Sequence, residues 1–366
     1  MPAIVHAKIN LSALLHNVKI VKHYAPKAKI LAMIKANAYG HGIIHAAKTL
    51  APVVDGLGVA RLGEAIMLHE QGIHSPLFIL DGFFSKEELQ KTLRDHFIPV
   101  INNMQQIEML TQTTLTHPTQ VWIKLNTGMN RLGFHPNEIF TVQQQLSQCK
   151  NVIQPTNFMM HFACAEEKTN LFNKKQSDLF WETIKNYPGE KSLANSAAII
   201  HFPEHHADWV RPGIMLYGCS PIPETTGNDF NLQPVMTLTS ELISIISVKK
   251  GDFIGYNGTY QCPHDTRIGI VGIGYGDGYP RHVENGTPVL INGKYAPLVG
   301  RVSMDMLTVD LQNHPEVKIG DKVTLWGEGL PVEIIAKAAN TICYELLCQV
   351  NQTPDRVEYE FIGGHL

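Results

Sequence analysis

Short apolar runs alternate with amphipathic stretches along the first part of the chain, and the alternation repeats about eight times. This pattern is typical of βα units around a parallel sheet, and eight such units close a barrel. It predicts an α/β fold with an N-terminal (β/α)8 TIM-like barrel. The runs expected to form its strands are 29–35, 56–60, 77–80, 98–101, 121–125, 157–162, 192–195 and 209–211.

The stretches between these runs have the spacing of apolar residues that amphipathic helices show. Ser85 and Glu88 stand three residues apart before an apolar pattern, which is the spacing of a capping box. The helices expected from this pattern cover 11–24, 41–50, 62–71, 85–95, 104–110, 136–148, 170–186 and 196–201.

A stretch rich in proline, glycine and asparagine, residues 221–234, follows the last βα unit and has the composition of a linker. Beyond it, runs of β-branched residues separated by turns such as Asn292-Gly293 predict strands, and only 332–341 predicts a helix. We therefore expect a C-terminal, mostly β domain. The predicted division is 11–227 for the barrel and 228–366 for the β domain, with residues 1–10 joined to the latter. The strands expected there are 235–248, 268–273, 289–299, 306–311 and 322–326.

Composition excludes several classes of function. The formal net charge is −3 and no basic run occurs, which argues against binding to nucleic acid or to an anionic membrane. The chain begins without a signal peptide and has no apolar segment of about 20 residues, so we expect a cytoplasmic protein. The six cysteines form no CxxC pair, which indicates reduced thiols and no metal site.

Lys35 is the most informative single residue, because it closes an apolar run at the end of a predicted barrel strand. Active-site groups of such barrels gather at the carboxyl ends of the strands. A lysine that loses solvent there acquires a lowered pKa and becomes nucleophilic toward aldehydes. From spacing alone, a lysine that reaches solvent at a strand end is an equally good interpretation.

The segment that follows, KANAYGHG at 35–42, resembles the cofactor-lysine signature of alanine racemases. More segments resemble the family in the order in which the family has them, and they span nearly the whole chain. They are 126–133, 160–163, 195–198, 211–218, 274–279, 300–305 and 344–345. The resemblance implies that pyridoxal 5'-phosphate is the cofactor and that Lys35 carries it as a Schiff base.

The resemblance also implies two catalytic residues, Lys35 and Tyr256, which move the α-proton on opposite faces of the substrate. A phenol has a pKa of about 10, and a chain of contacts from Tyr256 through His161 to Arg211 would lower it. In this family the arginine faces the cofactor's pyridine nitrogen. Guanidinium does not give up its proton near neutral pH, so the ring stays unprotonated, which favours racemisation over decarboxylation.

Further roles follow from the resemblance. The phosphate group is expected to contact a set of hydroxyls and backbone amides at a helix start: Tyr39, Ser196, Gly213, Ile214 and Tyr344.

Arg131 is expected to contact both the cofactor and the substrate carboxylate, and His161 and Arg211 complete the cofactor contacts. Met304 and Asp305 are expected to bind substrate, while Tyr275 and Tyr344 form the gate to the site.

Lys124 matches a lysine that is often carbamylated in the family, and a carbamate there would hold Arg131. Asn126, however, stands where many members have aspartate, so the local charge differs.

The expected function is the interconversion of L-alanine and D-alanine by a two-base mechanism, which supplies D-alanine for peptidoglycan. The family resemblance also implies a head-to-tail homodimer in which both subunits contribute to each active site. Two alternatives remain open at this stage: a racemase of another amino acid such as serine, and a non-enzymatic pyridoxal phosphate-binding protein. A decarboxylase is disfavoured by Arg211, and the glycines at 272–278 lack the spacing of a dinucleotide loop.

Overall fold

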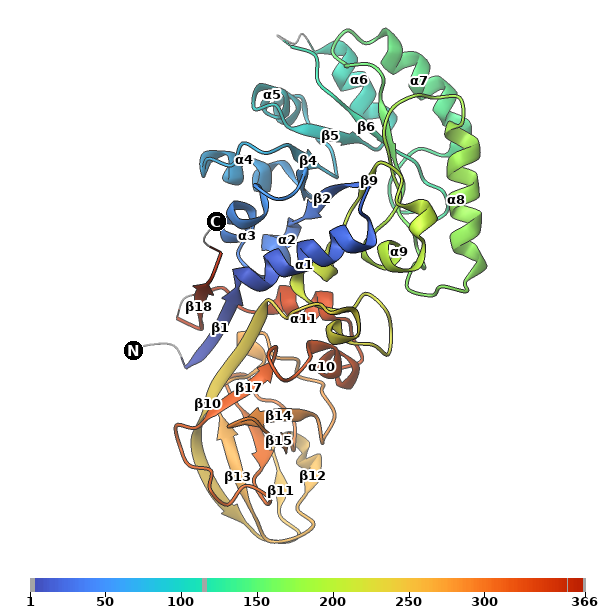
Figure 1. Ribbon diagram of the computed structural model, residues 1–366. Helices are drawn as coiled ribbons and strands as arrows, with labels where there is room; N and C mark the ends of the chain where they lie inside the picture. Colours follow the sequence, from blue (N-terminus) through green and yellow to red (C-terminus); the bar gives the residue numbers. More distant parts are fainter. Residues whose placement is uncertain (1–3, 114–116, 354, 365–366) are drawn as a thin grey trace.

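The structure is a computed structural model that describes residues 4–113, 117–353 and 355–364. A barrel of strands surrounded by helices lies above a separate β domain in Figure 1. The barrel sheet has eight parallel strands, in the order β8-β7-β6-β5-β4-β3-β2-β9. A parallel bridge between Asn195 and Arg211 brings its two ends together. The predicted fold class is confirmed.

The barrel strands are short and buried, as expected of a parallel sheet covered by helices. They are β2 (Lys29–Met33), β3 (Gly56–Val59), β4 (Leu77–Ile79), β5 (Ile98–Ile101), β6 (Trp122–Lys124), β7 (Asn157–Met159), β8 (Lys191–Ser192) and β9 (Trp209–Val210). The helices of this region are α1 (Leu11–Tyr24), α2 (Lys35–Tyr39), α3 (Ile43–Leu50), α4 (Leu62–Glu70), α5 (Lys86–Arg94), α6 (Met104–Gln112), α7 (Ile139–Gln148), α8 (Leu171–Ile184) and α9 (Ser196–His201).

Large aromatic side chains pack beside a glycine in the barrel core. The rings of Phe78, Trp122 and Trp209 form one aromatic cluster with centroids 5.4 to 6.1 Å apart. Gly56 makes room for this cluster, because a Cβ there would lie 2.8 Å from the Phe78 ring. The barrel interior is thus a packed core, and chemistry is confined to its end.

The β domain is one eight-stranded sheet in which all pairs but one are antiparallel. The exception is β1, near the N-terminus, which pairs in parallel with β18, near the C-terminus, from Val5↔Val357 to Asn10↔Ile362. The strands of the eight-stranded sheet are β1 (Val5–Asn10), β10 (Met236–Val248), β13 (Thr266–Val271), β14 (Pro288–Ile291), β15 (Lys294–Pro297), β16 (Leu307–Asp310), β17 (Lys322–Trp326) and β18 (Val357–Ile362). A separate two-stranded sheet, β11 (Phe253–Ile254) with β12 (Tyr260–Gln261), and the helices α10 (Val332–Ala338) and α11 (Cys343–Gln349) complete the region.

Three sequence predictions about these elements were wrong. Strand β2 ends at Met33, so Lys35 lies beyond the strand in the turn α2, and the next helix begins at Ile43. A second C-terminal helix, α11, was not predicted. The strands β1, β11, β12 and β18 were not predicted either. The domain division at 227/228 stays a prediction.

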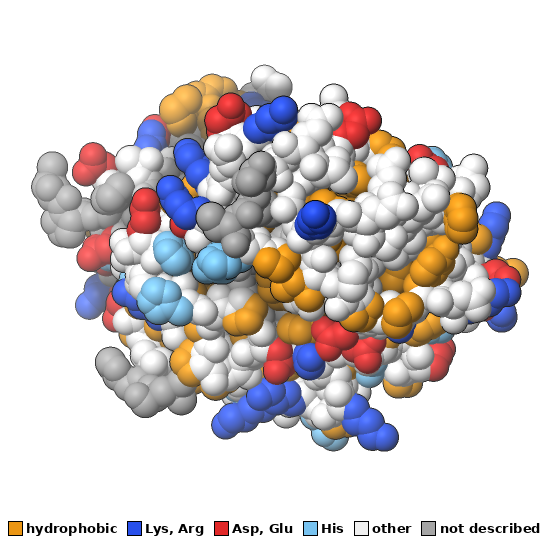
Figure 2. Space-filling model, turned by 90° about the horizontal axis from the view of Figure 1, so that it is seen from above, with side chains coloured by type: hydrophobic (Ala, Val, Ile, Leu, Met, Phe, Trp, Pro, Cys, Tyr) orange, Lys and Arg blue, Asp and Glu red, His pale blue; other side chains and the backbone are white. Residues whose placement is uncertain are grey.

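The surface carries charges of both signs. Lys and Arg side chains are interspersed with Asp and Glu over the face seen in Figure 2. No helix in the described ranges combines the length and apolarity that a membrane crossing requires.

Candidate active site

Lys35 sits at the start of a left-handed turn that directly follows β2. The next four residues have positive φ: Ala36 (51°), Asn37 (53°), Ala38 (54°) and Tyr39 (52°). Each such L-residue costs roughly 1–2 kcal/mol relative to a right-handed conformation. Consecutive residues of this kind are maintained only where the surrounding structure determines them, and they cluster at functional sites.

Contacts from several elements hold this turn. The amide of Ala36 donates to Glu64 Oε1 (2.8 Å), and Asn37 Oδ1 accepts from the amide of Ile43 (2.7 Å). His41 Nδ1 lies 3.0 Å from the carbonyl of Ala38, and burial lowers the pKa of His41 to about 4. The imidazole is therefore neutral and rigidly placed, and Lys35 is presented at a fixed position.

Gly40 joins the turn to the C-terminal region. It has a φ of 82°, and a Cβ on it would overlap the carbonyl oxygen of Leu347 in α11. Only glycine allows this approach. The position of Lys35 thus depends on a helix from the far end of the chain.

Arg211 is buried beside the same end of the barrel. Its guanidinium donates to Ser192 Oγ (2.7 Å), to the carbonyls of Met160 (2.6 Å) and Leu193 (3.3 Å), and to His161 Nδ1 (3.3 Å). Burial lowers the pKa of Arg211 to about 10, which leaves it charged at neutral pH. Burial and then Arg211 lower the pKa of His161, so the ring is neutral and accepts at Nδ1.

Four basic side chains gather here: Lys35, Lys124, Arg131 and Arg211. Burial and then Arg131 lower the pKa of Lys35, while burial and then Arg211 lower that of Lys124 to about 8. Asp81 opposes both shifts through its charge. Among the described residues, none of the four hydrogen-bonds to a carboxylate, so this site favours an anionic ligand.

A cradle of polar groups lies next to these bases. The amide of Gly213 donates to Ser196 Oγ at the start of α9 (2.9 Å), and the 3₁₀ turn Ile214–Tyr217 follows. A Cβ on Gly213 would overlap the hydroxyl of Tyr39. The Tyr39 ring is stacked on Tyr217 with centroids 4.8 Å apart. Hydroxyls and backbone amides at a helix start suit a phosphate.

Tyr344, on α11, lies with its ring centroid 5.9 Å from that of Tyr39, so it borders this cradle.

Asn126 organises the loop that leads to Arg131. Its Oδ1 accepts from the amides of Gly128 (3.1 Å) and Asn130 (2.9 Å), so its side chain stabilises the conformation of the loop.

The β domain carries a second group of predicted site residues on two turns that are bonded together. The amide of Tyr275 donates to the carbonyl of Ser303 (3.0 Å), and that of Gly276 to the carbonyl of Met304 (2.8 Å). This brings Tyr275 next to Met304 and Asp305, and all three are exposed.

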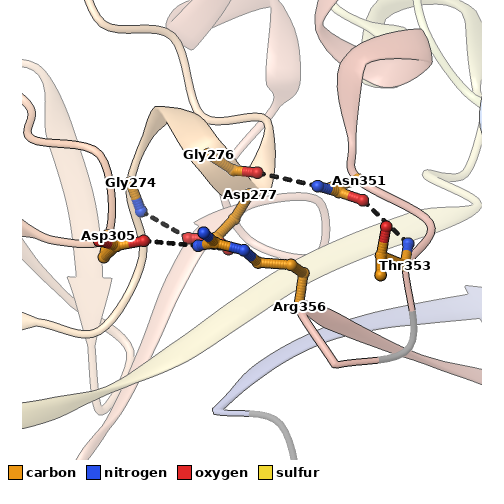
Figure 3. Close-up of polar contacts among 7 residues, drawn as sticks. All are labelled: Gly274, Gly276, Asp277, Asp305, Asn351, Thr353 and Arg356. Carbon is orange, nitrogen blue, oxygen red and sulfur yellow. Dashed lines mark hydrogen bonds and ion pairs between the residues drawn. The ribbon is translucent and has the colours of Figure 1, made fainter.

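Arg356 ties these turns to the C-terminal segment, as Figure 3 shows. Its Nη1 lies 2.5 Å from Asp305 Oδ1 and 3.3 Å from Asp277 Oδ1. Asp277 is buried and also accepts from the amide of Gly274 (2.9 Å). One guanidinium thus fixes both turns.

Among the described residues, Tyr275, Met304 and Asp305 form no hydrogen bond or ion pair with Lys35. Tyr256 follows β11 and is 62% exposed. β11 lies at the end of the β domain far from the barrel (Figure 1). On one chain, β11 and the following Tyr256 are therefore far from α2, which begins with Lys35.

Sequence reasoning missed three residues near Lys35. Asp81, Glu64 and Cys348 each influence the pKa of its amine. Asp81 follows the apolar strand β4 closely, and a polar residue after an apolar run was the signal that could have found it. Nothing local marks Cys348, because it reaches the site through the packing of α11.

Together, these features describe a (β/α)8 barrel that places a lysine and three further basic side chains beside a cradle of hydroxyls and backbone amides. The comparisons with known proteins specify it further. The chain belongs to the alanine racemase family: the model of the alanine racemase N-terminal domain matches residues 9–221 and that of the C-terminal domain residues 235–358.

Curated relatives and solved structures agree with this assignment. The alanine racemase of Aeromonas hydrophila is 46% identical over 356 residues, covering 97% of this chain and 99% of that protein. The biosynthetic alanine racemase of Escherichia coli K12 is 47% identical, covering 93% and 95%. The structure of the biosynthetic alanine racemase from Pseudomonas aeruginosa has a TM-score of 0.95 and 39% identity, covering 99% of this chain and 100% of that one.

Proposed function

We propose that the chain interconverts L-alanine and D-alanine with pyridoxal 5'-phosphate as cofactor, and that it serves cytoplasmic D-alanine supply for peptidoglycan. The observation that carries the proposal is the half-buried amine of Lys35 among three further basic groups, next to the cradle of Ser196, Gly213 and Tyr39. Family membership adds the reaction.

The residues present fit this cofactor. Its phosphate suits the cradle, including the amide of Ile214 and the hydroxyl of Tyr344, while its aldehyde suits the Lys35 amine. When bound, it supplies an electron-withdrawing ring that makes the substrate's α-hydrogen acidic. The guanidinium of Arg211 would face the ring nitrogen without donating a proton, which keeps the ring a modest electron acceptor.

The two bases have separate tasks. Lys35 moves the α-proton on one face of the substrate, and Tyr256 of the partner subunit moves it on the other. Arg131 binds the substrate carboxylate, together with the turn of Met304 and Asp305. The exposure of Tyr256 in the single chain supports a head-to-tail homodimer, because the site lacks its second base otherwise. Sedimentation of a fully active monomer would contradict this arrangement.

The direct test is chiral analysis of alanine after the purified protein is incubated with pure L-alanine and pyridoxal phosphate. We expect conversion to the racemate, and the same end point from D-alanine. If the protein binds the cofactor but leaves alanine unchanged while it racemises serine, the substrate assignment is wrong. If it binds the cofactor and racemises no amino acid, the enzymatic assignment is wrong.

Gly213→Ala tests the cradle. The added methyl group would displace the Tyr39 hydroxyl. Loss of about one phosphate hydrogen bond should weaken cofactor binding about tenfold. The measurement is the dissociation constant for pyridoxal phosphate by absorbance titration. Gly63→Ala is the control, because nothing lies within 4 Å of its Cβ position. An unchanged dissociation constant in Gly213→Ala would show that the Tyr39 hydroxyl does not contribute to phosphate binding.

Arg356→Ala tests whether the paired turns position the substrate. The variant loses both carboxylate contacts, so we expect KM for alanine to rise by roughly tenfold with a smaller fall in kcat. Arg356→Lys should restore part of the loss. The control is Arg94→Ala, which breaks a surface pair with Asp95. A loss confined to thermal stability would make Arg356 purely structural.

Lys124 is proposed to carry a carbamate that holds Arg131. Carbamates form from neutral amines, and the pKa of Lys124 is lowered to about 8. At constant dissolved CO2, the carbamylated fraction should therefore increase as pH rises from about 7 to about 9. A carbamate signal in ¹³C NMR after exposure to labelled CO2 measures it, and Lys124→Arg should abolish it. A signal that persists in this variant belongs to another amine.

A further inference from the structure

Cys219, Glu333 and Cys343 form a cluster outside the proposed active site. One ligand atom of each lies within 4.8 Å of the others. Cys219 follows the 3₁₀ turn Ile214–Tyr217, Glu333 is on α10, and Cys343 begins α11. Both thiols are free and buried. Cys219 is distant in sequence from Glu333 and Cys343, so no local spacing of cysteines marks the cluster.

Hydrogen bonds fix the carboxylate of Glu333 through only one of its two oxygens. Its Oε1 accepts from the amides of Ser220 (2.8 Å) and Gly227 (2.9 Å). Among the described residues, Oε2 has no hydrogen-bond partner. Cysteine sulfur and carboxylate oxygen are both donors that zinc accepts, and here a fixed carboxylate with a free oxygen lies beside two sulfur atoms.

The charges around the cluster also favour a cation. Among the described residues, Glu333 forms no ion pair with a basic side chain. Two thiols and a carboxylate without a basic partner are stabilised when a divalent cation binds them.

A cavity of about 240 Å³ adjoins the cluster and is lined by Cys219, Gly227 and Glu333, among others. It provides a path for a metal ion and room for a water ligand. A tetrahedral zinc ion with Zn–S bonds of about 2.3 Å holds its ligand atoms roughly 3.5 to 3.8 Å apart. The cluster therefore needs only a small contraction to reach this geometry.

We propose that Cys219, Cys343 and Glu333 bind a thiophilic divalent cation such as Zn²⁺, with water from the cavity as the fourth ligand. The bound ion would join the end of the 3₁₀ turn to α11, the helix that carries Tyr344 and packs on Gly40. The site is distinct from the proposed racemase chemistry and requires no change in it.

The test uses the purified full-length holoenzyme after chelator treatment and dialysis. Cd²⁺ is titrated in, and the sulfur-to-metal charge-transfer absorption is followed in the ultraviolet, with Zn²⁺ as competitor. We expect one cation per chain, release of about two protons, and protection of Cys219 and Cys343 from alkylation as read by mass spectrometry. Absence of a saturable band in this protein would overturn the proposal.

Variants assign the ligands. Cys219→Ser and Cys343→Ser should lower the affinity by at least about 100-fold, and Glu333→Gln by about tenfold or more. Cys262→Ser and Cys348→Ser are the controls, the first with a buried thiol in the β domain and the second with an exposed thiol on α11. Unchanged affinity in Cys343→Ser would overturn the site.

Glu333→Gln is the fallback if the serine variants misfold, because its side-chain oxygen can still accept from the amides of Ser220 and Gly227. If the serine variants do not fold, as circular dichroism would show, Glu333→Gln decides. Wild-type affinity in this variant would then reject the site.

Discussion

Lys35→Ala is expected to lower the rate of alanine racemisation by at least about 10⁴-fold, because it removes a nucleophile and a proton-transfer group together. Lys35 is only partly exposed, and its lowered pKa makes the neutral, nucleophilic amine more available than in a surface lysine. The assay is chiral chromatography of alanine over time, with the absorption spectrum of the bound cofactor recorded in parallel.

The matched control for this variant is Lys19→Ala, which removes an exposed lysine from α1. It should retain wild-type turnover and the wild-type cofactor spectrum. Retention of more than about a tenth of the activity in Lys35→Ala would assign the chemistry to another amine. Lys124 is the other lysine in the basic cluster, so its variants would then be examined first.

Tyr256→Phe is expected to reduce racemisation by about 10³-fold, because one of the two faces loses its base. The expected signature is asymmetric. In heavy water, the α-hydrogen of one enantiomer of alanine should still exchange through Lys35, and that of the other should not. Tyr295→Phe is the control, because this tyrosine is also on the β domain and similarly exposed, at 59% against 62%. Wild-type exchange of both enantiomers would exclude Tyr256 as a base.

The two variants together test whether each site is shared between subunits. In a mixed dimer of Lys35→Ala and Tyr256→Phe chains, one shared site would carry both substitutions and the other neither. Random mixing should restore about a quarter of wild-type activity. If no activity returns although mixed dimers form, both bases belong to the same chain.

The barrel could be predicted because each of its strands is a short apolar run followed by a helical stretch. This pattern follows from burial of the sheet on both faces, and the eight strands match the predicted runs, with ends that differ by a few residues. A polar residue at a strand end also pointed to Lys35, whereas Lys124 came from the family resemblance. The local sequence was therefore sufficient to predict the barrel strands and the position of Lys35 near a strand end.

The left-handed turn could not be predicted. Ala36, Ala38 and Tyr39 have no preference for positive φ, and the turn exists because distant groups such as Glu64 and Leu347 hold it. The same is true of the thiol pair Cys219 and Cys343, which only the folded chain brings together. Long-range packing determines such features, and the periodicity of apolar residues in the sequence does not indicate them.

The parallel pairing of β1 with β18 has a consequence for how the protein is made. β1 is synthesised before both of its partners, and its pairing with β18 waits until residues 357–362 have also been made. β10 can cover one edge of β1 earlier, but the other edge stays open until β18 is available. A nascent chain that stalls between β10 and β18 therefore presents an unpaired edge to other chains.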